Sequence, residues 1–272
     1  MIPSEEIVSG QNIAARCDFI FAQAITVNGG SAPYVSNRFP QLKGKEIIFC
    51  KTDFLNLFLQ CVDRFVERHI PFTVVTHDSD YSFTDDIISA FGDRPISWWA
   101  MNCQTTRANA IPIGIANSYC KVNLKQFSKA HNPTKLLYVN HRIHTFPLER
   151  EWLYPHFESK PWATVRTPSS ELDQYKHELL NHKFVLCPRG NGVDTHRMWE
   201  ALYSGVIPVV VRHQTHSMLE GNLPVLFVNH FSEVNEQMLN ESYDHFNSKH
   251  WNMDMLKVSW WINKMRGMPN AD

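Results

Sequence analysis

The sequence is poor in the features that mark membrane, secreted and nucleic-acid-binding proteins. It contains no run of about 18 apolar residues, the length that a membrane-spanning helix needs. Its formal net charge is −1, which argues against a surface dedicated to nucleic acid. The first ten residues, MIPSEEIVSG, lack the basic segment and apolar stretch of a signal peptide. These absences predict a soluble, cytoplasmic protein with no membrane span and no nucleic-acid partner.

Paired metal-binding motifs are absent as well. The six cysteines are scattered without a CxxC pair, and several lie in apolar segments. They are therefore expected to be reduced core residues of an intracellular protein. The 14 histidines form no HxH or HxxxH pair beside a suitable carboxylate. We expect no structural zinc and no metal cofactor.

Apolar residues make up 43% of the 272 positions, enough to build two small domains or one large one. Strand-like and helix-like segments alternate along the chain, which predicts an α/β layer architecture. The expected strands cover residues 46–50, 72–76, 96–100, 135–139, 163–166, 184–186, 206–211 and 224–228. The expected helices cover residues 53–69, 83–91, 147–157, 171–180, 194–204 and much of 232–265. Residues 111–115 are expected to form a short strand or a turn.

The pattern restarts after a polar segment that ends at Pro133. We therefore expect an N-terminal α/β domain over residues 1–130 and a second α/β domain over residues 131–248. Residues 249–272 carry Trp260 and Trp261 on an apolar helical face. This last segment is predicted to pack back toward the N-terminal domain.

Residues 183–212 predict a strand, a glycine loop, a helix and a second strand. A loop that enters a helix in this way presents backbone N–H groups to an anion such as a pyrophosphate. Arg189 and Arg197 flank the loop and suit phosphate oxygens, and Glu200 suits a ribose diol. The alternative is an ordinary βαβ unit in which Arg197 and Glu200 form a surface pair.

Three segments resemble exostosin-like glycosyltransferases. CPRGNGVDTHRMWEALYSGVIPVV, over residues 187–210, resembles their donor-site signature. LLYVNHRIHT, over residues 136–145, resembles the strand and loop that open the donor domain. THDSD, over residues 76–80, resembles an acceptor-side loop. The resemblance is strong over about residues 134–230, thin before residue 70, and closest to short glycosyltransferases encoded by large DNA viruses of algae.

The resemblance implies a GT-B-like fold, in which two Rossmann-like domains face each other across a cleft. It implies an inverting transferase that moves a sugar, xylose by family likeness, from a UDP-sugar to a hydroxyl of a glycan acceptor. A viral member would work in the host cytoplasm. Arginines and helix amides would take the place of a metal ion at the diphosphate. The expected donor-binding residues are Arg142, Thr145, Arg189, Gly190, Asn191, Gly192, Val193, Asp194, Thr195, His196, Arg197 and Glu200.

Asp194 is expected to cap the helix or to orient an arginine, because a carboxylate beside a pyrophosphate is repelled. The general base is expected in the loop after residues 72–76, with Asp80 the first choice, Asp78 the second and His77 the third. Tyr81 and Asn102 are candidate acceptor-binding residues.

Three alternatives stay open for the acceptor-side loop and for the chain. Asp78 and Asp80 match the DxD pattern of metal-dependent GT-A transferases, which use Mg²⁺ or Mn²⁺. They also suit a turn that caps the following helix. A non-catalytic protein of the same fold that binds a nucleotide or a carbohydrate is the remaining alternative.

Overall fold

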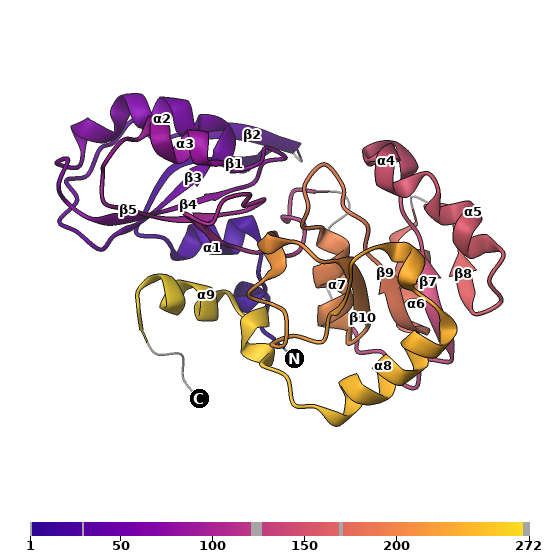
Figure 1. The fold of residues 1–272 in the computed structure, drawn as a ribbon. Helices are drawn as coiled ribbons and strands as arrows, with labels where there is room; N and C mark the ends of the chain where they lie inside the picture. Colours follow the sequence, from indigo (N-terminus) through magenta and orange to yellow (C-terminus); the bar gives the residue numbers. More distant parts are fainter. Residues whose placement is uncertain (1, 29, 121–126, 169–170, 269–272) are drawn as a thin grey trace. The chain divides into compact units, whose positions relative to one another are not determined.

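The chain folds into two compact units, each built around its own sheet (Figure 1). The computed structural model describes residues 2–28, 30–120, 127–168 and 171–268. Unit 1 is Met1–Asn123 together with Asp254–Asp272, and unit 2 is Leu124–Met253. Both sheets are mainly parallel, so the prediction of an α/β chain is confirmed. Across the described residues, every helix is too short or too polar to cross a membrane.

The sheet of unit 1 has the strand order β2-β1-β3-β4-β5-β6. The strands β1, β3, β4, β5 and β6 are parallel neighbours, and β2 pairs antiparallel with β1 at the edge. Along the chain, the strands are β1 (Phe19–Val27), β2 (Gly30–Val35), β3 (Ile47–Lys51), β4 (Phe72–His77), β5 (Ile96–Ala100) and β6 (Asn109–Ala110). The described parallel strands of this sheet, β1, β3, β4, β5 and β6, follow one another in chain order without a reversal, and β2 lies on the other side of β1.

Helices α2 (Leu55–Cys61) and α3 (Asp85–Ala90) lie on one face of this sheet, and α1 (Gly10–Arg16) lies on the other (Figure 1). Alternate strand residues such as Ile48 and Val74 join the core beneath α2 and α3 because successive side chains point to opposite faces. The C-terminal helix α9 (Val258–Met265) contacts α1 within unit 1. The helix expected over residues 53–69 is shorter because 3-10 turns precede and follow α2.

The sheet of unit 2 has the order β11-β10-β9-β7-β8, and all its pairings are parallel. Its strands are β7 (Lys135–Val139), β8 (Ala163–Val165), β9 (His182–Leu186), β10 (Ile207–Val211) and β11 (Leu226–Val228). If the five strands are numbered by their order along the chain, they lie side by side in the order 2-1-3-4-5, starting from β8. This is the flavodoxin-like arrangement of doubly wound sheets. In such sheets the direction of winding reverses between the first and third strands, here β7 and β9. Ligands bind outside the carboxyl ends of the strands at this reversal.

Helices cover both faces of the unit 2 sheet. Leu153 and Phe157 of α5 (Leu153–Glu158) and Leu239 of α8 (Glu236–Ser248) pack against alternate residues of β7, β9 and β10. Tyr138 of β7 alternates with these residues and so faces the other side of the sheet. Its ring centroid lies 6.2 Å from that of Tyr175 in α6 (Leu172–Leu180). Helix α7 (His196–Ser204) packs against β10. It ends at Gly205, whose φ of 72° is a left-handed conformation that favours glycine.

Candidate functional site

In unit 1, polar side chains gather where β3, β4 and β5 end. His77 closes β4, and it pairs in register with Lys51 at the end of β3. Asp78 follows with a φ of 58°, and Asn102, after β5, has a φ of 53°. Left-handed backbone is uncommon outside glycine, and such strained residues cluster at functional sites. This edge of the sheet is therefore one candidate site.

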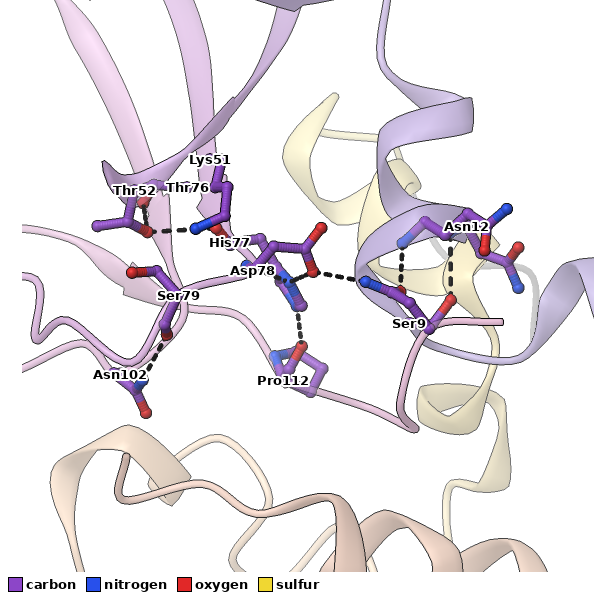
Figure 2. Close-up of polar contacts among 12 residues, drawn as sticks. Ser9, Asn12, Lys51, Thr52, Thr76, His77, Asp78, Ser79, Asn102 and Pro112 are labelled. Carbon is purple, nitrogen blue, oxygen red and sulfur yellow. Dashed lines mark hydrogen bonds and ion pairs between the residues drawn. The ribbon is translucent and has the colours of Figure 1, made fainter. Parts of the chain in front are cut away.

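His77 is held on both sides of its ring. Figure 2 shows the ring between Asp78 and Pro112, and only 1% of the residue is exposed. The Asp78 backbone N–H donates to Nδ1 at 2.8 Å, and Nε2 lies 3.0 Å from the Pro112 carbonyl oxygen. Nε2 faces a carbonyl oxygen, which can only accept, so Nε2 carries a proton and donates to Pro112. His77 is thus placed to orient Asp78 rather than to meet a substrate.

Asp78 is surrounded by donors. Its Oδ1 accepts a hydrogen bond from Asn117 Nδ2 at 2.9 Å and lies 3.0 Å from His77 Nδ1. Burial raises the pKa of the Asp78 carboxyl, but the His77 and Asn117 contacts outweigh it and hold the pKa below its usual value. Asp78 is therefore a carboxylate at neutral pH.

Gly10, at the start of α1, makes this arrangement possible. A Cβ at residue 10 would lie 1.9 Å from Asp78 Oδ1 and 2.7 Å from His77 Nδ1. The same helix is tied to Asn117, since the Gln11 backbone N–H donates to Asn117 Oδ1 at 2.8 Å. Neither Gly10 nor Asn117 was predicted to belong to this site.

Two of the three remaining predicted residues of this site, Asp80 and Tyr81, are exposed in the loop after Asp78, and the third, Asn102, is buried. Asp80 is exposed, and Tyr81 is 65% exposed. Asn102, in contrast, is 1% exposed and donates through Nδ2 to the Ser79 carbonyl oxygen at 3.2 Å (Figure 2). In this structure Asn102 supports the loop, whereas Asp80 and Tyr81 are accessible to solvent.

In unit 2, the predicted donor residues gather at the reversal between β7 and β9. Asn140 and Arg142 follow β7, and the glycine loop follows β9. Arg197, in the first turn of α7, donates through Nη2 to Asn140 Oδ1 at 3.5 Å. Its Nε is buried and meets no acceptor within the described part of the chain. An unsatisfied guanidinium N–H at this position suits an anionic ligand.

Arg150 connects the two loops at this crevice. Its side chain donates to three backbone carbonyl oxygens, those of Arg189 at 2.7 Å, Arg142 at 2.8 Å and Pro188 at 3.0 Å. The residue is 5% exposed. Burial, and then the charge of Arg197, lower the pKa of Arg150 to about 10, so the guanidinium stays charged at neutral pH. A buried cation held by carbonyl groups adds positive potential to the crevice.

The glycine loop is partly organised by its own amides. The Gly190 N–H donates to the Gly192 carbonyl at 3.0 Å, and the Arg189 N–H donates to Glu149 Oε1 at 2.8 Å. A Cβ on Gly190 would lie 3.4 Å from both Thr145 Cγ2 and Arg150 Nη2, so the structure brings Thr145 to the loop. The Arg189 guanidinium carbon lies 4.3 Å from the centroid of the Phe146 ring. In this structure the Gly190 amide bonds within the loop.

Asp194 is bonded within the interior of unit 2. It is 4% exposed and accepts hydrogen bonds from the Thr195 N–H at 2.9 Å and from Trp199 Nε1 at 3.0 Å. His216 Nε2 lies 3.6 Å from Asp194 Oδ1. The N-cap position of α7 is occupied by Thr195, which makes no side-chain capping bond, and His196 is the first helical residue. Asp194 thus fixes the start of α7 through Trp199.

Glu200 forms a pair with Tyr175. The Tyr175 hydroxyl donates to Glu200 Oε2 at 2.9 Å, and Glu200 is 8% exposed. Burial raises the pKa of Glu200, and the nearby Arg197 charge opposes that rise. The Arg197 guanidinium carbon lies 5.7 Å from the Tyr175 ring centroid. Arg197, Tyr175 and Glu200 therefore form one cluster. Sequence analysis missed Tyr175.

Two of the other missed residues had readable signals. Arg150 lies three and seven residues before Leu153 and Phe157, on the apolar face of the helix predicted over residues 147–157, which the structure divides into α4 (Pro147–Arg150) and α5. A charged residue at such a position marks a buried contact. Asn140 stands directly after a predicted strand, where ligand-binding residues of α/β sheets occur. Across the described ranges, no group of three or more His, Cys, Asp or Glu side chains is arranged to hold a metal ion.

A family model matches part of the chain. Residues 156–268 match the model described as RXYLT1 C-terminal domain, a glycosyltransferase (xylosyltransferase) family. The matched range is less than half of the chain, and it contains the glycine loop, α7 and the Tyr175–Glu200 pair. It also continues through α9. The match confirms the prediction that the chain is an enzyme, a glycosyltransferase.

Proposed function

We propose that this chain is an inverting, metal-independent glycosyltransferase of the GT-B type that uses a UDP-sugar. The donor sugar is xylose, which the match to a xylosyltransferase family favours, and the acceptor is a hydroxyl group of a glycan. The observation that carries the proposal is the cluster of Arg150, Arg189 and Arg197 around the glycine loop. This cluster stands at the strand-order reversal of unit 2, inside or beside the range that matches a xylosyltransferase family.

Unit 2 binds the nucleotide half of the donor in this proposal. The leaving UDP gains negative charge as the sugar–phosphate bond breaks, so fixed cations at the diphosphate lower the barrier. Arg197 has an unsatisfied Nε, and its Nη2 donates to Asn140 Oδ1 at 3.5 Å. In this proposal the Arg197 guanidinium donates a hydrogen bond to a phosphate oxygen of the UDP-sugar. Arg142 and Arg189 add charge, and Glu200 accepts hydrogen bonds from the ribose hydroxyls.

Unit 1 supplies the general base in this proposal. Asp80 removes the proton of the acceptor hydroxyl, and the acceptor oxygen then forms a bond to the anomeric carbon. The bond from that carbon to the β-phosphate oxygen breaks, and UDP leaves from the opposite side, which inverts the configuration. Asp80 is preferred because it is exposed. Asp78 is bonded to Asn117 and close to His77, and its lowered pKa makes it the weaker base.

The proposal is tested by incubating the full chain with UDP-xylose and a panel of glycan acceptors, with and without excess EDTA. We expect UDP release and a product of inverted configuration, at the same rate in both conditions. Loss of all activity in EDTA, with recovery in Mn²⁺, would instead establish a metal-dependent reaction at Asp78 and Asp80. A thermal-shift panel of nucleotide sugars identifies the donor, since bound ligand raises apparent stability.

A further inference from the structure

A small cavity lies beside the glycine loop, and Glu149, from the segment that follows β7, forms part of its lining. Its volume is about 150 Å³, and none of its lining residues except Arg189 and Val193 was predicted to bind the donor. It stands at the carboxyl ends of β9 and β10. The lining includes Glu149, Arg189, Val193, Val210, Arg212 and His213.

The cavity, at about 150 Å³, is smaller than the roughly 300–1,000 Å³ of pockets that hold drug-sized ligands, so it suits one small group of the donor rather than a whole nucleotide. The cavity shares Arg189 and Val193 with the glycine loop and the segment that leads into α7, whereas Arg197, Tyr175 and Glu200 are not among its lining residues. In the proposed donor complex, a nucleotide sugar whose diphosphate lies on the loop directs its nucleotide toward Glu200 and its sugar into the cavity.

His213 offers a hydrogen-bond donor to the cavity. Its Nδ1 accepts the Thr215 backbone N–H at 3.1 Å, which caps the short 3-10 turn Gln214–His216. Burial, and then the charges of His216 and Arg189, lower the pKa of His213, so its ring is neutral at pH 7. In a neutral ring that accepts at Nδ1, the proton is on Nε2, which is then available as a donor.

Glu149 offers an acceptor. Its Oε1 receives the Arg189 backbone N–H at 2.8 Å, and each carboxylate oxygen can accept more than one bond. The second cation of the lining, Arg212, is neutralised by Glu220, which accepts from Nε at 3.0 Å and from Nη2 at 2.9 Å. A carboxylate beside a paired arginine favours a neutral hydroxylated group over a further phosphate.

Apolar side chains form the rest of the lining. Val193 and Val210 are 8% and 4% exposed, and Cys187 and Val211 lie beside them. Beside the two arginines, the His213 donor and the Glu149 acceptor over an aliphatic surface suit the hydroxyl groups and C–H faces of a pyranose.

Resting on the proposed function, we infer that this cavity holds the transferred sugar of the donor, an unsubstituted pyranose, and that Glu149 and His213 select it. Neither residue is expected to contribute to binding of UDP itself. The sugar half and the nucleotide half of the donor are thus recognised by different residues of unit 2.

The test measures the dissociation constants of UDP, UDP-xylose and UDP-N-acetylglucosamine for the full chain by calorimetry. Three variants are compared with the wild type: Glu149→Gln, His213→Asn and the exposed control Gln214→Ala. Gln keeps an oxygen for the Arg189 N–H, and Asn keeps an oxygen that can cap Thr215. Melting curves show that each variant is folded.

For UDP-xylose we expect each site variant to lose about three- to tenfold in affinity, the value of one neutral hydrogen bond. Affinity for UDP stays at the wild-type value, and Gln214→Ala changes neither. Wild-type protein binds UDP-N-acetylglucosamine no better than UDP, because the acetamido group does not fit. Unchanged affinity of both site variants for UDP-xylose, or tight binding of UDP-N-acetylglucosamine, overturns the cavity assignment while UDP binding stands. Failure of the wild type to bind UDP overturns the proposed function together with the cavity assignment.

Discussion

The two units carry polar clusters at the carboxyl ends of their parallel strands, but they balance charge in opposite ways. In unit 1 the Asp78 carboxylate accepts from Asn117 and lies beside His77, in space that Gly10 leaves open. In unit 2 the buried Arg150 is held by three carbonyl groups, and Arg197 keeps an unsatisfied N–H. The first cluster holds a carboxylate whose charge is stabilised by neighbouring donors, whereas the second contains arginines with an unsatisfied N–H that can bind an anion.

Topology accounts for part of this difference. The parallel strands of unit 1 follow one another in order, so the loops after β3, β4 and β5 stand side by side and bond to one another. The order of unit 2 reverses between β7 and β9, so the loops after these two strands diverge to opposite faces. A diverging pair leaves a crevice that a ligand can fill. Arg150 bonds to both loops and keeps their spacing fixed.

Replacing Asp80 with Asn removes the proposed general base of unit 1, and we expect it to have the largest effect on activity. Turnover falls about a hundredfold or more because the amide cannot accept the acceptor proton. Affinity for the UDP-sugar, measured by calorimetry, stays at the wild-type value. The matched control is Asp86→Asn, an exposed aspartate of α3, which retains wild-type turnover. Full turnover in Asp80→Asn would place the base elsewhere, with Asp78 the next residue to replace.

Replacing Arg197 with Ala removes charge from the unit 2 cluster. UDP binding weakens by about 1.5–3 kcal/mol, the range for hydrogen bonds to charged groups. Calorimetry with UDP measures the loss, and Lys160→Ala, at a partly exposed lysine after α5, serves as the control. An unchanged dissociation constant for UDP would remove Arg197 from the donor site.

Acidification separates the two clusters by pH. Burial lowers the pKa of His141, beside Arg150, from 6.5 to about 4, and the nearby arginines add to this. Between these values the unfolded chain binds a proton that the folded chain does not, so stability falls as pH drops from 6.5 toward 4. The loss reaches at most about 3 kcal/mol at pH 4. Asp78, whose pKa is lowered, loses its contribution only in more acidic solution.

His141→Gln tests this dependence, since Gln keeps polar groups but does not titrate. The melting temperature of wild type should fall between pH 6.5 and 4 more steeply than that of the variant. Equal slopes would show that His141 does not govern acid stability.

Two glycine substitutions compare the space in the clusters and have the smallest expected effects. Gly10→Ala places a Cβ 1.9 Å from Asp78 Oδ1 and is expected to cost about 1–3 kcal/mol of stability, as overpacking does. Gly190→Ala meets its nearest neighbours at 3.4 Å and should leave stability nearly unchanged. Thermal unfolding measures both. The comparison fails if Gly10→Ala is as stable as wild type.

The sequence predicted the central strands well because buried parallel strands are short apolar runs between clear breaks. The predicted strands at 96–100 and 135–139 have the observed bounds of β5 and β7. The hairpin of β1 and β2 was not predicted, although Asn28-Gly29-Gly30 between apolar runs is a hairpin signal. Residues 111–115, expected to form a short strand or a turn, lie outside the strands, since β6 ends at Ala110.

The candidate donor site was partly readable because glycine, arginine and helix start are local features. The contribution of Arg150 depends on carbonyl groups about 40 residues away. The role of Gly10 depends on a side chain near residue 78, and no local pattern reports such a contact. Sequence spacing thus located the loop, while the groups that position it required the fold.

The most direct test of the central claim is a crystal structure of the chain with UDP. We expect the two phosphates at the glycine loop, with phosphate oxygens within hydrogen-bond distance of Arg197 and of backbone N–H groups at the start of α7. UDP bound at another place, or at this loop with Arg197 directed away from its phosphates, would show that the glycine loop and Arg197 do not form the diphosphate site.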